Sequence, residues 1–193
     1  MARMVRGDAA RNLALYVLVD RSGSMCVVDA DVRQAMMIIY LAATSLEIPI
    51  GITYFGSADH LESPDRVFEL TPVQSMVNEE VKPLIAGFEG VTGAEFLNWG
   101  LLLAEKSLAQ PPERNKVFIV IHYGKPVYKE DDWELSCTHL RRLESQLITT
   151  FGIYLGTTPE DQTSLKILFF LMIITSGKDL PEKLGALLRG LAR

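Results

Sequence analysis

Cysteine is scarce in this sequence, with only Cys26 and Cys137 among 193 residues. The two lie far apart and form no C-x-x-C pair, so neither a disulfide-bonded scaffold nor a zinc module with paired cysteines is expected. Reduced thiols are the expectation instead, because disulfides rarely persist in a reducing compartment. The cysteine content therefore predicts a cytoplasmic protein.

Long apolar runs are also missing. The most apolar stretch, residues 165–175, falls well short of the roughly 18 residues that span a membrane, and it is expected to be buried core. The run at 13–19 is short and leads straight into Asp20 and Arg21, unlike a secretory signal peptide. Neither a membrane span nor a signal sequence is predicted.

Positive charge is not in excess, since the net charge is −5 and the isoelectric point is near 5.3. Such a balance argues against broad binding to nucleic acid or to acidic membranes. Three arginines in residues 1–11 are expected to lie in a flexible N-terminal tail. The chain also has no Gly-x-x-x-x-Gly-Lys-[Ser/Thr] loop, so it is not expected to be an ATPase of the P-loop class.

What the sequence does contain is a regular alternation of strand-like and helix-like segments. Strands are predicted at 13–19, 48–56, 66–70, 116–124, 148–156 and 171–175, the third of these short and at an edge. Helices are predicted at 29–46, 75–88, 97–108, 133–147, 162–169 and 180–191. The pattern predicts one α/β domain over 1–193, with a Rossmann-like, doubly wound, mostly parallel sheet flanked by helices on both faces.

The first predicted strand ends in a group of oxygen-bearing side chains. Asp20, Ser22 and Ser24 follow the apolar run, and Gly23 between the serines allows the backbone to turn tightly. Carboxylates and hydroxyls are ligands that suit a hard cation such as Mg²⁺. The loop therefore predicts a candidate cation site at the carboxyl end of a buried strand.

This D-x-S-x-S loop resembles the signature of von Willebrand factor A domains. In that family the loop forms a metal-ion-dependent adhesion site, which a threonine and a second aspartate from later loops complete. The segment EGVTGAEFLNWGL, residues 89–101, resembles the family's Gly-x-Thr loop and implies Thr92 as a fourth metal ligand. The alternative is that Thr92 only caps a turn or a helix.

The second aspartate is missing. Residues 117–126 read VFIVIHYGKP, which places His122 and Tyr123 where the family has a hydroxyl residue and the acid. Tyrosine offers a neutral phenol at neutral pH. With Asp20 as the sole carboxylate, Mg²⁺ binding is expected to be weak or absent, or to need an acidic residue from a partner. The phenol of Tyr123 filling the site is an alternative.

A narrower resemblance concerns the segment IYLAATSLEIPIGITYFGS at 39–57, the GKP at 124–126 and the helix LPEKLGALLRGL at 180–191. These look like the C-terminal A domains of the cobaltochelatase large subunit and of nitric-oxide-reductase and Rubisco-activation accessory proteins. The resemblance implies a non-catalytic adaptor for a MoxR-type AAA+ ATPase. The expected partner-binding residues are Arg21, Met25, His122, Tyr123 and Lys125.

Two other functions stay open. One is a structural or assembly subunit that keeps the fold without a metal ion. The other, less favoured, is a hydrolase that uses Ser22 or Ser24 with a histidine, although the sequence lacks Gly-x-Ser-x-Gly. Zinc binding by Cys137, His139 and His122 lacks the usual ligand spacing, and solvated helix positions are expected for Cys137 and His139.

Overall fold

The computed structural model describes residues 12–56, 67–74, 79–91, 97–123, 130–155, 166, 168–169 and 171–191. These residues form a six-stranded sheet with the strand order β3-β2-β1-β4-β5-β6. Its strands are β1 (Leu13–Asp20), β2 (Ile50–Phe55), β3 (Val67–Gln74), β4 (Asn115–His122), β5 (Thr149–Leu155) and β6 (Leu171–Thr175). Only β3 runs antiparallel to its neighbour; the other pairs are parallel.

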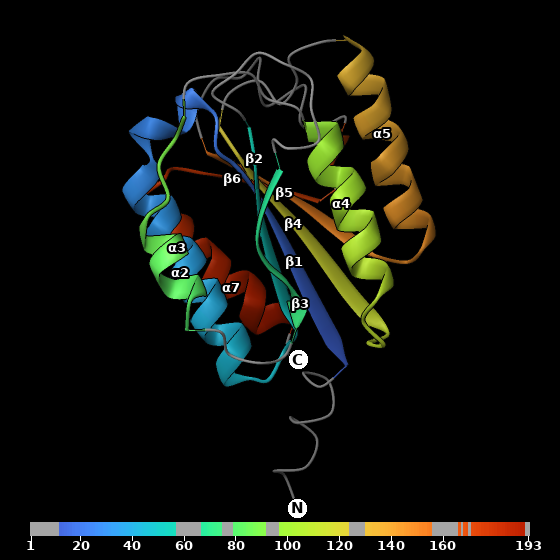
Figure 1. Ribbon diagram of the computed structural model, residues 1–193, viewed down its shortest axis with the longest axis horizontal. Helices are drawn as coiled ribbons and strands as arrows, with labels where there is room; N and C mark the ends of the chain where they lie inside the picture. The colour runs from blue at the N-terminus through green and yellow to red at the C-terminus, as the bar shows by residue number, and fades with distance from the viewer. Residues whose placement is uncertain are drawn as a thin grey trace, which may run out of the picture.

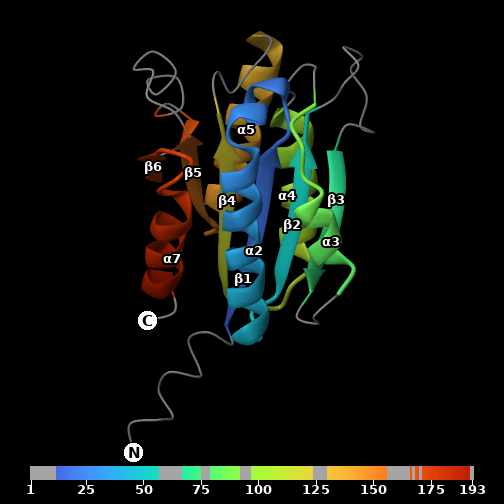
Figure 2. The ribbon, with the colours of Figure 1, turned by 90° about the vertical axis from the view of Figure 1, so that its left-hand side faces the viewer.

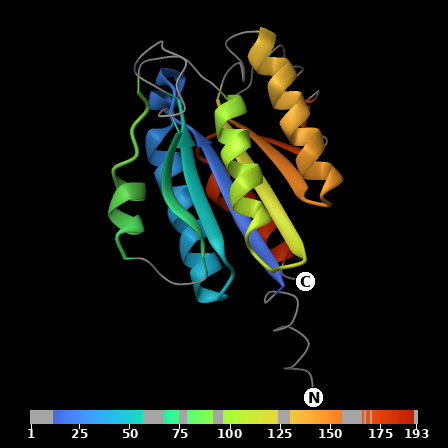
Figure 3. The same cartoon turned by 45° about the vertical axis from the view of Figure 1, so that its right-hand side comes forward.

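Helices cover both faces of this sheet (Figures 1 and 2). A short 3₁₀ helix, η1 (Gly23–Val27), follows β1. The α-helices are α2 (Asp29–Ser45), α3 (Val81–Ala86), α4 (Leu97–Ala109), α5 (Glu130–Ser145) and α7 (Leu180–Leu191). Helices α2, α3 and α7 lie on one face and α4 and α5 on the other, as Figure 3 also shows. The predicted α/β fold is confirmed.

Strand β1 shows why the sheet has two apolar faces. Its eight residues are all buried, and alternate side chains point to opposite faces. Leu15, Val17 and Val19 join the hydrophobic cluster beneath α2 and α7, whereas Tyr16 and Leu18 join the cluster beneath α4 and α5. We call these the α2 cluster and the α4 cluster. The continuous apolar run is thus explained by burial on both sides.

Strands β1 and β4 are neighbours at the point where the strand order reverses direction. The connections that leave these strands lead to opposite faces, and ligands of doubly wound sheets bind where such connections separate. Asp20 ends β1 and His122 ends β4. The topology therefore directs attention to the carboxyl ends of these two strands.

Two predictions about this sheet need correction. Residues 171–175 were expected to be buried, but Leu171 and Ile174 are 38% and 39% exposed, because β6 is an edge strand paired only with β5. The helix expected over 75–88 is shorter and covers Val81–Ala86, while 75–78 lie outside the described residues. Pro83 does not break it, because a proline in the first turn needs no N–H donor there.

The last helix, predicted at 180–191, is present as α7. Leu180 and Leu184 are buried, and Leu187 packs against the α2 cluster. Its start is organised by Ser176, whose hydroxyl lies 2.7 Å from Asp179 Oδ2 and accepts the Asp179 N–H at 3.2 Å.

The tail 1–11 and most of the helix expected at 162–169 lie outside the described residues. Within the described ranges, no helix has the length and apolarity needed to cross a membrane.

Candidate functional site

The candidate site is built around Asp20, which is completely buried at the end of β1. Its Oδ1 accepts the backbone N–H of Ser22 at 2.7 Å, and its Oδ2 accepts the Ser22 hydroxyl at 3.1 Å. Ser22 is only 2% exposed and has an extended backbone before η1 begins. Both carboxylate oxygens are thus used to fold the loop back onto the end of the strand.

The hydroxyl of Ser24 extends this network toward β4. Ser22 Oγ and Ser24 Oγ are 2.8 Å apart, and Ser24 Oγ lies 3.1 Å from the carbonyl oxygen of Tyr123. Ser22 donates its proton to Asp20, so the single proton of Ser24 is shared between Ser22 and the Tyr123 carbonyl. The predicted convergence of Asp20, Ser22 and Ser24 is therefore present, and a backbone carbonyl of the β4 loop closes it.

His122 and Tyr123 point to different faces of the sheet. The imidazole of His122 is 1% exposed, with Nε2 3.7 Å from Asp20 Oδ2 and its ring centroid 6.1 Å from that of Phe55. Tyr123 instead packs against the α2 cluster. The phenol of Tyr123, which was one candidate for filling the site, therefore packs with apolar side chains, and the histidine faces Asp20.

A third segment, residues 88–91, is fastened to the D-x-S-x-S loop. Arg21 Nε donates to the carbonyl of Glu89 at 2.9 Å, and the N–H of Val91 donates to the carbonyl of Arg21 at 2.8 Å. Further bonds join Gly90 to this loop and to α2: Gly90 N–H to Asp29 Oδ1 at 3.0 Å and Cys26 Sγ to Gly90 O at 3.4 Å. Thr92 is the next residue, but it lies outside the described residues, as does Lys125.

The predicted partner-binding residues divide by exposure. Arg21 and Tyr123 are partly exposed, but Met25 and His122 are buried at 0% and 1% and cannot touch a partner from these positions. The turn of η1 instead exposes Cys26 and Val27, the latter to 73%. Sequence reasoning missed these two, because nothing in the run Met25-Cys26-Val27 indicates which side chain faces inward. We define the strand-end face as Arg21, Ser24, Cys26, Val27 and Tyr123.

No protein-family model and no curated protein sequence matches this chain. Solved structures do match its fold. The vWF domain of the type V pili tip protein Mfa5 from Porphyromonas gingivalis matches with a TM-score of 0.70 and 9% identity, over 94% of this chain and 96% of that one. The SpRpn10 VWA domain matches with a TM-score of 0.63 and 14% identity, over 88% and 94%. This chain has a von Willebrand factor A fold.

The same fold occurs inside larger proteins. The pilus adhesin SpaC from Lactobacillus rhamnosus GG matches with a TM-score of 0.75 and 11% identity, over 94% of this chain but 31% of the adhesin. The chain thus spans about a third of the length of that protein. Identities this low establish a shared von Willebrand factor A fold and leave the roles of individual residues to be argued from the site itself.

The metal site expected of a von Willebrand factor A fold can be tested against the donors present. The described residues supply one carboxylate, two hydroxyls that bond one another, and a buried imidazole facing the same carboxylate. Among the described residues, no group of three or more His, Cys, Asp and Glu side chains could hold a metal ion. Serine and threonine hydroxyls are not among those four residue types, and Thr92, the fourth ligand expected from the sequence, lies outside the described residues.

The zinc ligands considered from the sequence lie apart in the described part of the chain. Ser22 bonds Asp20, while the Nδ1 atom of His139 lies 2.7 Å from Glu105 Oε1 between α5 and α4. His139 is 9% exposed, so the expectation that it is solvated was wrong. Cys137 is half-buried on α5, and burial raises the pKa of its thiol. The zinc ligands considered from the sequence are therefore not brought together.

Proposed function

We propose that this chain is a non-catalytic protein–protein interaction module that binds its partner through the strand-end face. The observation that carries the proposal is the hydrogen-bonded loop 20–27, which presents Cys26 and Val27 on top of a buried polar network. An exposed valine on a loop already held in one conformation binds at a low entropic cost.

Three neighbouring segments contribute to the rigidity of this face. The loop after β1 is bonded to segment 88–91 through Arg21 and to the β4 end through Ser24. A surface assembled from three chain segments holds its shape only while the fold is intact. Partner binding is thus expected to depend on the folded domain and not on a short linear motif.

The proposed partner is another subunit of a larger assembly, with a MoxR-type AAA+ ATPase as the leading candidate. This rests on the resemblance of residues 39–57, 124–126 and 180–191 to adaptor domains. The guanidinium of Arg21, partly exposed at the face, suits an acidic residue presented by the partner. We propose a cytoplasmic location, and we propose neither nucleic acid nor a membrane as a partner.

The ion is not needed for this role as we propose it. Mg²⁺ is expected to bind weakly or not at all, because Tyr123 replaces the second acid and Asp20 is the sole carboxylate of the loop. The closed hydroxyl network favours a second candidate, a structural or assembly subunit with a metal-free A fold. The two differ in whether the partner leaves and returns, which a dissociation rate measures.

A matched pair of substitutions tests the proposed face. Val27→Asp places a charge on the strand-end face. Leu147→Asp places the same charge just before β5, at the end of the sheet opposite that face. Leu147 is 86% exposed and has a positive φ of 61°, which Asp tolerates. Binding to a purified MoxR-type ATPase, and recovery of bound neighbours by mass spectrometry, are measured for both variants in EDTA and in Mg²⁺.

We expect Val27→Asp to reduce partner recovery at least about tenfold, as a buried charge at an interface costs more than 1.4 kcal/mol. Leu147→Asp and EDTA are expected to have no effect. Equal loss in both variants, or loss in EDTA, would contradict the proposal. Hydrolase turnover that disappears in Ser22→Ala or Ser24→Ala would favour the enzymatic alternative.

A further inference from the structure

We propose that His122 takes the position beside Asp20 that a divalent cation would need, so that the strand-end face is metal-independent by construction. The inference concerns the protein without a partner, so its test is independent of the proposed binding role. It makes His122 a second reason for weak metal binding, in addition to the replacement of the second acid by Tyr123.

Strand geometry explains why this histidine faces the carboxylate. In β4, Phe118 and Val120 point into the α4 cluster, and His122 is the next residue with the same orientation. Asp20 ends the adjacent strand and pairs in register with Phe55, whose ring neighbours the imidazole at 6.1 Å. The three side chains therefore lie in a row on the α4 side of the sheet.

The contacts of Asp20 place the imidazole of His122 where an ion on that side of the carboxylate would lie. Oδ1 accepts one bond from Ser22 and Oδ2 accepts another, while Nε2 of His122 faces Oδ2 at 3.7 Å. Mg²⁺ sits about 2.1 Å from its oxygen ligands. On the line between Oδ2 and Nε2, it would lie only about 1.6 Å from the nitrogen, which is shorter than a metal–nitrogen bond of about 2.0 Å. An ion approaching on this side must displace the imidazole.

Burial makes such a displacement expensive. His122 is 1% exposed and packs beside Phe55, while Asp20 is 0% exposed. A buried carboxylate needs compensating polar neighbours, and here the Ser22 N–H, the Ser22 hydroxyl and the imidazole surround it. Displacing the imidazole would therefore disturb a buried row of side chains that packs Asp20, Phe55 and His122 together.

The test uses four variants of the full chain: His122→Thr, Tyr123→Asp, the double variant, and the double variant with Asp20→Ala as its control. The melting temperature of each is measured in EDTA and in 10 mM MgCl₂. A ligand at about one hundred times its Kd raises the melting temperature of a chain of this size by at least about 5 °C.

We expect a shift of that size only in the double variant, and its loss when Asp20→Ala is added. The wild type and both single variants are expected to shift by less than about 1 °C. Three outcomes overturn the proposal: an Asp20-dependent shift in the wild type, a shift in Tyr123→Asp as large as in the double variant, or no shift in a folded double variant.

A measurement on the wild type keeps the proposal testable if the double variant does not fold. Mn²⁺ is added to the ¹⁵N-labelled protein and the broadening of amide signals from residues 21–27 is followed. We expect no more broadening there than in Asp20→Ala. Selective broadening in the wild type that Asp20→Ala removes would overturn the proposal, because an ion would then bind with His122 in place.

Discussion

Gly90 lies directly against Cys26. A Cβ atom at position 90 would stand 2.8 Å from the backbone nitrogen of Cys26 and 2.9 Å from both its sulfur and the carbonyl oxygen of Ser22. Such distances are shorter than ordinary van der Waals contacts, so only glycine fits between segment 88–91 and η1. This approach lets five hydrogen bonds join that segment to the loop and to α2.

The first prediction is that Gly90→Ala destabilises the protein by about 1–3 kcal/mol, because two backbone atoms must move to admit the methyl group. Chemical denaturation measures the change, and amide exchange of residues 21–27 should become faster. Gly190→Ala is the control. Its Cβ would meet nothing within 4 Å, so this substitution in α7 should stabilise by about 0.5–1 kcal/mol. A Gly90→Ala protein as stable as the wild type would contradict the packing described above.

The second prediction concerns the bond between Glu105 and His139, which joins α4 to α5. Their atoms Oε1 and Nδ1 are 2.7 Å apart, and the side chains are 14% and 11% exposed. A double-mutant cycle with Glu105→Ala and His139→Ala should give a coupling energy of about 1–3 kcal/mol, because the partner left behind is buried.

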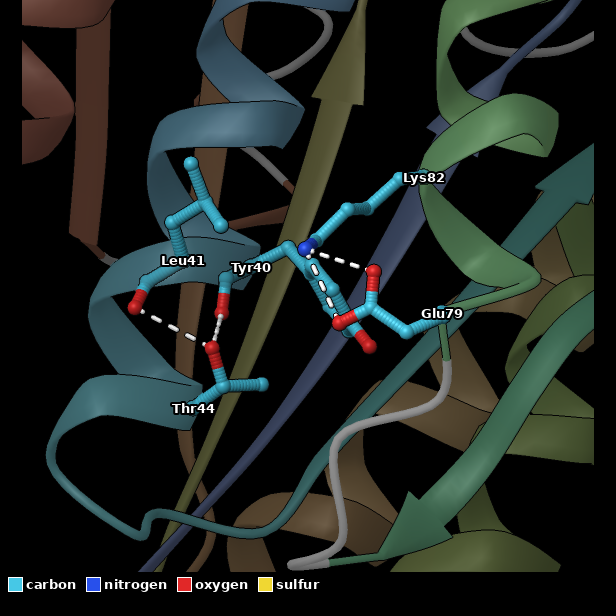
Figure 4. A network of polar contacts seen from close by, with 5 residues as sticks. All are labelled: Tyr40, Leu41, Thr44, Glu79 and Lys82. Carbon is cyan, nitrogen blue, oxygen red and sulfur yellow. Dashed lines mark hydrogen bonds and ion pairs between the residues drawn. The ribbon is translucent and has the colours of Figure 1, made fainter.

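The exposed pair of Glu79 and Lys82 is the matched control for that cycle (Figure 4). Lys82 Nζ lies 2.8 Å from Glu79 Oε2, but the side chains are 36% and 74% exposed. Its coupling should stay below about 0.5 kcal/mol and disappear in 1 M NaCl. Equal coupling energies for the two pairs would show that burial between α4 and α5 contributes nothing.

The third prediction is a loss of stability in alkali that depends on Tyr16. Burial raises the pKa of Tyr16 from 10.0 to about 12, although its hydrogen bond to Thr53, at 2.7 Å, lowers it in part. Since the pKa is higher in the folded state, this contribution is complete below pH 10 and is lost between pH 10 and 12. The total loss from this residue should be about 2–3 kcal/mol.

Unfolding by urea at a series of pH values measures this loss. Tyr16→Phe should cost about 1 kcal/mol at pH 8, because Thr53 loses its partner, but should show a shallower decline above pH 10. A slope unchanged by Tyr16→Phe would assign the alkaline loss to other groups. Tyr54, whose pKa burial also raises, is then the group to examine.

The fourth prediction is that α7 has a packing role. Leu184 is fully buried against the α2 cluster, so Leu184→Ala should cost about 2–5 kcal/mol. Leu135→Ala on α5, where the leucine is 48% exposed, should cost much less. The affinity of the folded fraction for a partner should be the same in both variants. A tenfold change in Leu184→Ala alone would mean that α7 acts as a switch.

The local sequence pattern was sufficient to predict the fold class and the loop that follows β1. The apolar run at 13–19 can be satisfied only by burial on both faces, and its alternation with amphipathic helices leads to a doubly wound sheet. The sequence also predicted the oxygens of Asp20, Ser22 and Ser24 as one loop, because their spacing acts within a few residues. The sequence alone also indicated that Tyr123 stands at the position of the family's second aspartate.

Long-range neighbours were decided by the tertiary structure alone. The approach of His122 to Asp20 depends on the pairing of β1 with β4, and the bond between Glu105 and His139 joins residues 34 apart on two helices. Ile174 is exposed because β6 is an edge strand. Val27 is exposed and Met25 is buried because of the way η1 turns. Composition and periodicity describe how a residue relates to its own segment; which segments become neighbours is set by the packing of the whole chain.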